Sequence, residues 1–143
     1  RSPSRGLGDV YKRQGLFIDR FGKVKRQFTV DMEGIQDGDL FILNETFLYD
    51  NGEEEFRRWE ITKTGEKTYQ GSSSDIKGIA LGERSGNAVN WHYTLKLKYK
   101  DGIMLVKFDD WLIMQDEKNV FNKATMKKFG VRLGDVYLFF KKN

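Results

Sequence analysis

The sequence predicts an all-β protein, an antiparallel up-and-down β-barrel of about eight to ten strands. From Gly15 onward, apolar and polar residues alternate with a period of two, and no stretch sustains the 3.6-residue period of a helix. Gly and Asx-Gly pairs separate the alternating stretches. Many short strands in continuous hairpin order are typical of a barrel, and closing the barrel leaves no exposed edge strand.

The composition is that of one folded domain. The chain has 143 residues, with 25 Lys and Arg against 21 Asp and Glu, one His and no Cys. A disulfide framework, a thiolate nucleophile and a Cys-ligated metal are therefore excluded. With so few nitrogen and sulfur ligands we expect no metal site, and no motif indicates a cofactor.

Residues 1–14 differ from the remainder. They carry four basic side chains and one acidic side chain, a net charge of +3 out of +4 for the whole chain. The string resembles a translated sequencing-adapter sequence, so we predict a non-native or disordered tail at 1–14 and a single barrel domain at 15–143. A native basic arm is the alternative. The remaining charge near +1 argues against a nucleic-acid partner, and deleting 1–14 is expected to leave stability unchanged.

Turn signals divide the domain into strands. Asn51-Gly52 and Asp101-Gly102 are strong signals for two-residue type I′ turns, whose central residues both need positive φ. Gly65-Glu66 is a weaker signal. The predicted strands lie near 15–20, 23–33, 39–50, 53–63, 67–71, 76–82, 88–100, 103–115, 119–127 and 133–142.

The 51–52 turn predicts which side chains meet across its hairpin. A two-residue loop there places Asp50 opposite Glu53 and therefore Glu45 opposite Arg58. The strand before the turn carries an apolar stripe that only Glu45 interrupts. We therefore expect Glu45 and Arg58 to form a pair on the inner face of the barrel.

The 101–102 turn makes a similar prediction for the next long hairpin. It places Tyr93 opposite Asp110, on a face that also holds Trp91 and Phe108. Asp110 is the only charged residue that this register predicts on that face. On the strand near 23–33, Arg26 shares a face with apolar residues and completes the polar groups expected inside the barrel.

These inward polar residues allow three interpretations. They form a structural network of ion pairs, or a polar floor of a ligand cavity, or a catalytic pair in which Asp110 or Glu45 transfers protons. An unpaired buried charge costs several kcal/mol, so pairing or solvation is required in each case. The predicted ligand-binding residues are Arg26, Glu45, Arg58, Trp91, Tyr93, Phe108 and Asp110.

Several long strings resemble family 3833 of the domains of unknown function, over essentially all of 15–143. They are Asp19–Gly34, Tyr49–Trp59, Gly82–Leu95, Phe108–Trp111 and Asn122–Lys142. The resemblance implies a lipocalin- or calycin-like barrel on the periplasmic side of the bacterial cell envelope, anchored by an N-terminal lipid that this chain lacks. Members of that family are often encoded near cyclopropane fatty-acid synthases, so the resemblance also implies lipid chemistry. No activity is established for that family, so it supplies no catalytic residues. It usually has Arg where this chain has Lys123.

We therefore expect non-catalytic binding of a lipid or other hydrophobic small molecule inside the barrel, with Arg26, Arg58 and Tyr93 meeting its polar head. One alternative is a barrel with a filled interior that acts as an interaction protein. The other is an enzyme that acts on modified fatty acyl chains through a buried carboxylate. The sequence does not determine the oligomeric state.

Overall fold

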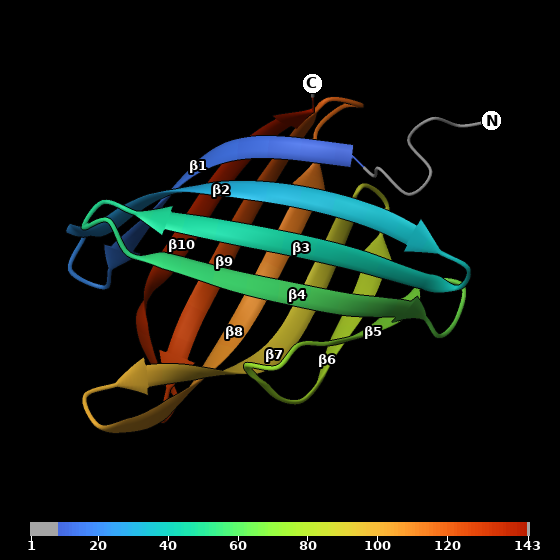
Figure 1. Cartoon of the computed structure of the whole chain (residues 1–143). Helices are drawn as coiled ribbons and strands as arrows, with labels where there is room; N and C mark the ends of the chain where they lie inside the picture. Colours follow the sequence, from blue (N-terminus) through green and yellow to red (C-terminus); the bar gives the residue numbers. More distant parts are fainter. Residues whose placement is uncertain (1–8, 143) are drawn as a thin grey trace.

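Residues 9–142 are described by the structure, a computed structural model, and within them the chain forms ten β-strands (Figure 1). No helix in that range is long and apolar enough to cross a membrane. The strands are β1 (Asp9–Asp19), β2 (Val24–Asp37), β3 (Leu40–Tyr49), β4 (Glu54–Lys63), β5 (Thr68–Ser72), β6 (Ile76–Ser85), β7 (Ala88–Tyr99), β8 (Gly102–Met114), β9 (Asn119–Lys128) and β10 (Val131–Lys142).

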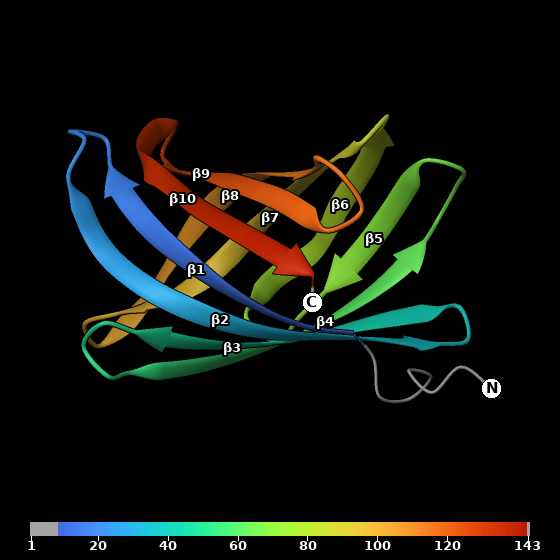
Figure 2. The same ribbon diagram turned by 90° about the horizontal axis from the view of Figure 1, so that it is seen from above.

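The strands close into one antiparallel up-and-down barrel, which confirms the predicted fold class. Each strand pairs with its neighbours in the chain, and β1 closes the barrel by pairing with β10. In the described range the strand count lies at the upper end of the predicted eight to ten. Figure 1 shows β2–β4 crossing β7–β10 at a steep angle, so the barrel has two walls that run in different directions, and in Figure 2 β1 lies between β2 and β10.

The first strand starts earlier than the sequence predicts. Residues 9–14 are part of the tail that the sequence predicts at 1–14, but they belong to β1 and pair with both β2 and β10. Arg13 is buried, and its guanidinium lies 4.0 Å from the centre of the Phe140 ring. The boundary predicted at residue 15 is therefore corrected, because the inner side of the barrel continues through these residues.

The apolar core lies on the inner face of the barrel and consists of two clusters. The first lies where β2, β3 and β10 meet inside the barrel and contains Val30, Met32, Phe47, Leu138 and Phe140. The second contains Trp59, Ile76, Ala80, Leu95, Val106, Phe108 and Ala124. Burial follows the period-two alternation of the strands, so the outward neighbours of these residues are mostly exposed.

The register predicted for the β3–β4 hairpin is wrong by one residue. The loop spans three residues, Asp50–Gly52: the Tyr49 amide donates to the Glu53 carbonyl at 2.9 Å, and Gly52 adopts a φ of 88°. Glu45 consequently lies opposite Arg57, not Arg58. Because side chains alternate between the two faces of a strand, this one-residue shift moves the whole of β4 to the opposite face.

The register predicted for the β7–β8 hairpin is wrong by two residues. The turn lies at Lys100–Asp101, where Lys100 has a φ of 53°, so Tyr93 lies opposite Phe108 and Trp91 opposite Asp110. A shift of two residues keeps every side chain on its predicted face. The predicted inner surface of these two strands is therefore retained although its pairs differ.

Gly134 is a position where the fold requires the absence of a side chain. A Cβ atom there would lie 2.3 Å from the backbone oxygen of Ile18, beside a register shift between β9 and β10. We expect Gly134→Ala to lower the free energy of unfolding by about 1–3 kcal/mol, because backbone must move to admit the methyl group. Urea unfolding measures this. Gly102→Ala is the control, since a Cβ at Gly102 meets no atom within 4 Å, and an equal loss in both variants would contradict the assignment.

The contribution of residues 9–14 can be measured by truncation. Removing 1–14 deletes four of the nine pairs that β1 makes with β10 and six of the ten that it makes with β2, so we expect a lower free energy of unfolding than for a chain that lacks only residues 1–8. The comparison isolates the contribution of 9–14. Equal urea midpoints for the two truncated chains would show that these residues contribute nothing to the closed barrel.

Candidate functional site

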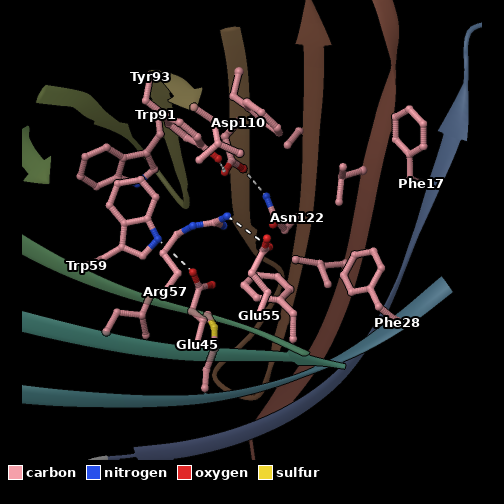
Figure 3. A pocket seen from close by; sticks show the side chains of 18 of the residues that line it. Phe17, Phe28, Glu45, Glu55, Arg57, Trp59, Trp91, Tyr93, Asp110 and Asn122 are labelled. Atoms are coloured by element: carbon pink, nitrogen blue, oxygen red, sulfur yellow. Dashed lines mark hydrogen bonds and ion pairs between the residues drawn. The ribbon is translucent and has the colours of Figure 1, made fainter. Parts of the chain in front are cut away.

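The barrel encloses a cavity of about 340 Å³ whose wall is mainly apolar. Its described lining comes from every strand except β5 and β6, and Figure 3 shows polar side chains that project into it. The polar lining residues are Arg26, Glu45, Tyr49, Glu55, Arg57, Tyr93, Asp110 and Asn122. The cavity therefore combines a large apolar surface with a compact polar cluster.

Six of the seven predicted ligand-binding residues line this cavity: Arg26, Glu45, Trp91, Tyr93, Phe108 and Asp110. Arg58 does not, because its side chain is 46% exposed on the outside of β4, where it pairs with Glu60. The one-residue shift in the β3–β4 register explains this correction, and Arg57 takes the inward position instead.

Arg57 is the central cation of the cavity. Its Nε lies 2.7 Å from the Asp75 carboxylate and one terminal nitrogen lies 3.6 Å from Glu55. Figure 3 shows its side chain extending between Glu45 and Asp110. Burial lowers the pKa of Arg57, but the charges of Asp75 and Glu45 outweigh that effect and raise the pKa overall, so the guanidinium stays charged.

Glu45 is a buried carboxylate on β3 that interrupts an apolar stripe. The Trp59 indole nitrogen donates a hydrogen bond to its Oε1 at 2.9 Å. Burial raises the pKa of Glu45, while the nearby charge of Arg57 and the bond from Trp59 partly oppose that rise. Burial therefore favours the neutral acid, which can donate a hydrogen bond, more than water would.

Asp110 is the second carboxylate of the cavity and lies on β8. The Tyr93 hydroxyl donates to its Oδ2 at 2.9 Å, and the Asn122 amide donates to its Oδ1. The same Asn122 amide nitrogen also donates to the Trp111 carbonyl at 2.8 Å, which fixes its orientation. Burial raises the pKa of Asp110 to about 6, although the two side-chain hydrogen bonds act in the opposite direction.

Aromatic rings form the wall beside these carboxylates. Tyr93 stacks on Phe108 with ring centres 5.2 Å apart, and Trp59 meets Tyr93 edge-on at 5.3 Å. Trp91 lies against the backbone of Gly82, where a Cβ atom would approach its ring to 2.9 Å. The absence of a side chain at Gly82 gives the Trp91 ring the space to lie against this backbone.

The solvent side of the cavity is near the β3–β4 turn. Glu55 is 45% exposed and accepts a hydrogen bond from the Tyr49 hydroxyl at 2.9 Å. The Arg26 guanidinium lies 4.3 Å from the centre of the Tyr49 ring and 3.6 Å from the Asp50 carboxylate. Arg26 is thus at the mouth, whereas Glu45 and Asp110 lie deeper.

Sequence reasoning missed Arg57, Asn122 and Glu55 as cavity residues. A signal for Arg57 existed, because Trp59 and Ile61 share its period-two face and are apolar, unlike the alternate residues Arg58 and Glu60. The Asn51-Gly52 turn signal predicts the opposite register and conflicts with this pattern. No local signal indicates Asn122, since its contact with Asp110 depends on the pairing of β8 with β9.

This arrangement is suited to holding a ligand with one polar group. It offers hydrogen-bond acceptors at Glu45 and Asp110, a donor at Arg57 and aromatic faces around them. In the part of the chain that the structure describes, no group of three or more His, Cys, Asp or Glu residues is placed to hold a metal ion.

Comparison with protein families identifies one whose members share this whole domain. The family described as "Protein of unknown function (DUF3833)" matches residues 7–142. The chain belongs to the DUF3833 family. The match includes residues 9–14 at the start of β1. A comparison of this DUF3833 protein with curated proteins gave no match.

Among solved structures, one similarity is to the acyl-CoA thioesterase II TesB2 from Mycobacterium marinum. The aligned region covers 94% of the DUF3833 chain and 81% of the thioesterase, with 8% sequence identity and a TM-score of 0.28. A score this low supports no inference about fold or activity.

The elevated pKa of Asp110 predicts a pH-dependent stability. Between about pH 4 and about pH 6 the folded protein keeps a proton that the unfolded chain releases, so stability contributed by Asp110 falls as the pH rises through that window. We expect Asp110→Asn to remove this dependence. The free energy of unfolding of the variant relative to the parent should rise across the window by up to about 3 kcal/mol.

Urea unfolding as a function of pH measures that difference, and carbon NMR of the Asp110 carboxyl group measures the pKa directly. Asp109→Asn is the matched control, because the Asp109 side chain is 40% exposed on the outer face of the same strand. A midpoint for Asp110 near its ordinary value would contradict the burial of this carboxylate.

Proposed function

We propose that this DUF3833 protein binds one hydrophobic small molecule or a single acyl chain inside its barrel, without changing it chemically. The observation that carries this proposal is the cavity of about 340 Å³ with its apolar wall. Ligand pockets are commonly about 300–1,000 Å³, so a cavity of this size suits one chain and not a diacyl phospholipid. A barrel with a filled interior, acting only as an interaction protein, accounts less well for this space.

The charges inside the cavity specify the polar group of the ligand. Glu45 and Asp110 are two carboxylates around one guanidinium, and Arg57 is already bonded to Asp75. A ligand carboxylate placed deep in the barrel would therefore face like charges. A hydroxyl, amide or amine can donate to either carboxylate, so we propose a neutral or cationic polar end there. An acidic head group would have to remain near Arg26 at the mouth.

The lining residues favour binding over covalent catalysis. None of the described residues that line the cavity is Ser, Thr, Cys, His or Lys, so the nucleophile of a covalent mechanism there would have to be a carboxylate or a Tyr hydroxyl. Asp110 supports a second candidate, an enzyme that moves a proton on a modified acyl chain, because burial raises its pKa to about 6. Asp110→Asn separates the two functions, since it would abolish turnover of such a substrate and leave an apolar ligand bound.

An envelope location and a lipid anchor remain proposals for this protein. They follow from the resemblance noted for the sequence and agree with a ligand drawn from membrane lipids. Native mass spectrometry of the purified chain, followed by lipid extraction, tests for a co-purifying molecule. An acyl lipid or an apolar metabolite supports the proposal and identifies the ligand.

Trp59 and Trp91 line the cavity and provide an intrinsic fluorescence signal for binding. We expect long-chain alcohols or amines to change this fluorescence at lower concentration than the fatty acid of equal length, because the deep polar groups include two carboxylates. Equal affinities for all three would contradict the assigned polarity, and no response to any member of the panel would contradict the ligand-binding proposal.

A pair of adjacent residues supplies the matched variants. Ala124 is buried and lines the cavity, while Lys123 is exposed on the outer face of the same strand. We expect Ala124→Leu to weaken binding at least about tenfold by filling part of the cavity, and Lys123→Leu to leave it unchanged. Circular dichroism and melting temperature verify that both variants are folded. Equal binding by both would place the ligand outside the barrel.

A further inference from the structure

Three neighbouring turns at one end of the barrel form a continuous part of its rim. They join β1 to β2, β9 to β10 and β7 to β8, and the up-and-down order places them at the same end. The Arg20 amide donates to the Leu133 carbonyl at 3.0 Å, and the Lys128 ammonium donates to the Leu105 carbonyl at 3.1 Å. Each turn thus contacts the neighbouring strand pair. Figure 1 shows the first and last of these turns projecting at the left.

This part of the rim, which we call the basic rim (19–25, 98–103 and 127–132), presents large apolar side chains to solvent. Phe129 is 91% exposed and Phe21 is 75% exposed, the highest values among the exposed large hydrophobic residues of the described chain. Val24, Ile103 and Val131 are also exposed on it. Apolar groups gathered at the tips of adjacent turns indicate contact with something outside the chain.

Phe129 occupies a backbone position that disfavours it. Its φ is 53° and that of Gly130 is 77°, so both central residues of this two-residue turn have positive φ. Asn, Asp and Gly adopt that geometry readily, whereas a bulky side chain is unusual there. Because the ring is exposed, packing within the barrel does not offset the strain. The residue is therefore unfavourable for folding, and its ring is available to an external partner.

The basic rim is also strongly cationic. Its three segments carry eight Lys or Arg and two Asp, whereas the entire chain has a net charge of only +4. Arg132 is paired with Asp135, but Arg20, Lys23 and Lys127 are exposed. The β3–β4 turn at the same barrel end carries the opposite charge, with four acidic and no basic residues in 50–55. The charge is thus concentrated on one side of this end.

We propose that the basic rim docks on the surface of an anionic lipid bilayer, with Phe21 and Phe129 inserted among the head groups. Apolar side chains flanked by Lys and Arg bind such interfaces because burial and attraction to anionic lipid act together. The acidic β3–β4 turn is repelled, so the barrel tilts onto the basic rim. A second copy of the chain is a poorer partner, because a two-fold contact would bring the two cationic surfaces together.

The docking surface does not depend on the cavity or its ligand. Its residues lie on the turns, and the cavity variant Ala124→Leu is expected to bind vesicles as the parent does. Failure of the ligand proposal therefore leaves this one intact, and the reverse also holds. If both hold, docking brings the side of the cavity mouth at Arg26, next to the rim segment 19–25, close to the lipid from which a ligand is taken.

Co-sedimentation of the full chain with vesicles tests the proposal. We expect binding to vesicles of phosphatidylglycerol and phosphatidylethanolamine, weaker binding as salt is added, and little binding to phosphatidylcholine alone. The double variant Phe21→Ser, Phe129→Asn should reduce the partition coefficient about tenfold or more. Phe129→Asn alone should keep or raise the melting temperature, because Asn suits the turn. Weaker binding by this single variant therefore cannot result from unfolding, and the melting temperature of the double variant shows whether it is folded.

Matched controls exist for both kinds of residue. Phe56 is exposed on β4 beside the acidic turn, so Phe56→Ser should leave binding unchanged. Lys23→Ser with Lys127→Ser should weaken binding, whereas Lys63→Ser with Lys67→Ser, at the opposite barrel end, should not. The proposal is overturned if the chain does not bind vesicles, or if binding does not depend on the lipid charge. It is also overturned if the control variants lose as much vesicle binding as the rim variants, or if the rim variants change only the oligomeric state in sedimentation.

Discussion

The pairing of β1 with both β2 and β10 is the constraint on which the rest of the structure depends. It removes the two free edges that an open sheet would expose and turns the inner faces of all strands toward one another. Once the barrel is closed, every second residue of each strand must enter a shared interior. The cavity, its polar cluster and the crossing of the two walls all follow from that closure.

Enclosure also determines the chemistry of the interior charges. Glu45 and Asp110 would be ordinary surface carboxylates on an open sheet, but inside the barrel their desolvation raises both pKa values. The positive charge of Arg57 opposes this rise for both carboxyl groups. Trp59, Tyr93 and Asn122 donate hydrogen bonds to their oxygens. An ion-pair network that fixes packing and a polar floor that orients a ligand are compatible, because the same cluster borders the cavity.

The interior of the barrel and the basic rim differ in how well their residues suit folding. The interior follows the rules of folding closely, with buried apolar residues and paired charges. The basic rim departs from them, since Phe129 adopts positive φ without packing and Phe21 is exposed at a turn tip. Natural sequences depart from local rules mainly where function requires it. This contrast is the reason for assigning the rim, and not the barrel wall, to contact with a membrane.

The sequence by itself determined the class of fold, the strands near their observed positions and the inward face of β7 and β8, because period-two alternation and turn residues are local signals. It placed Arg26, Glu45, Tyr93 and Asp110 toward the interior for the same reason. Only the tertiary structure decided that Arg57 and not Arg58 meets Glu45, since the length of the 50–52 loop sets the register and a single residue reverses the face. It also decided that Asn122 meets Asp110 and that residues 9–14 close the barrel, because those contacts join strands through pairings that no local pattern encodes.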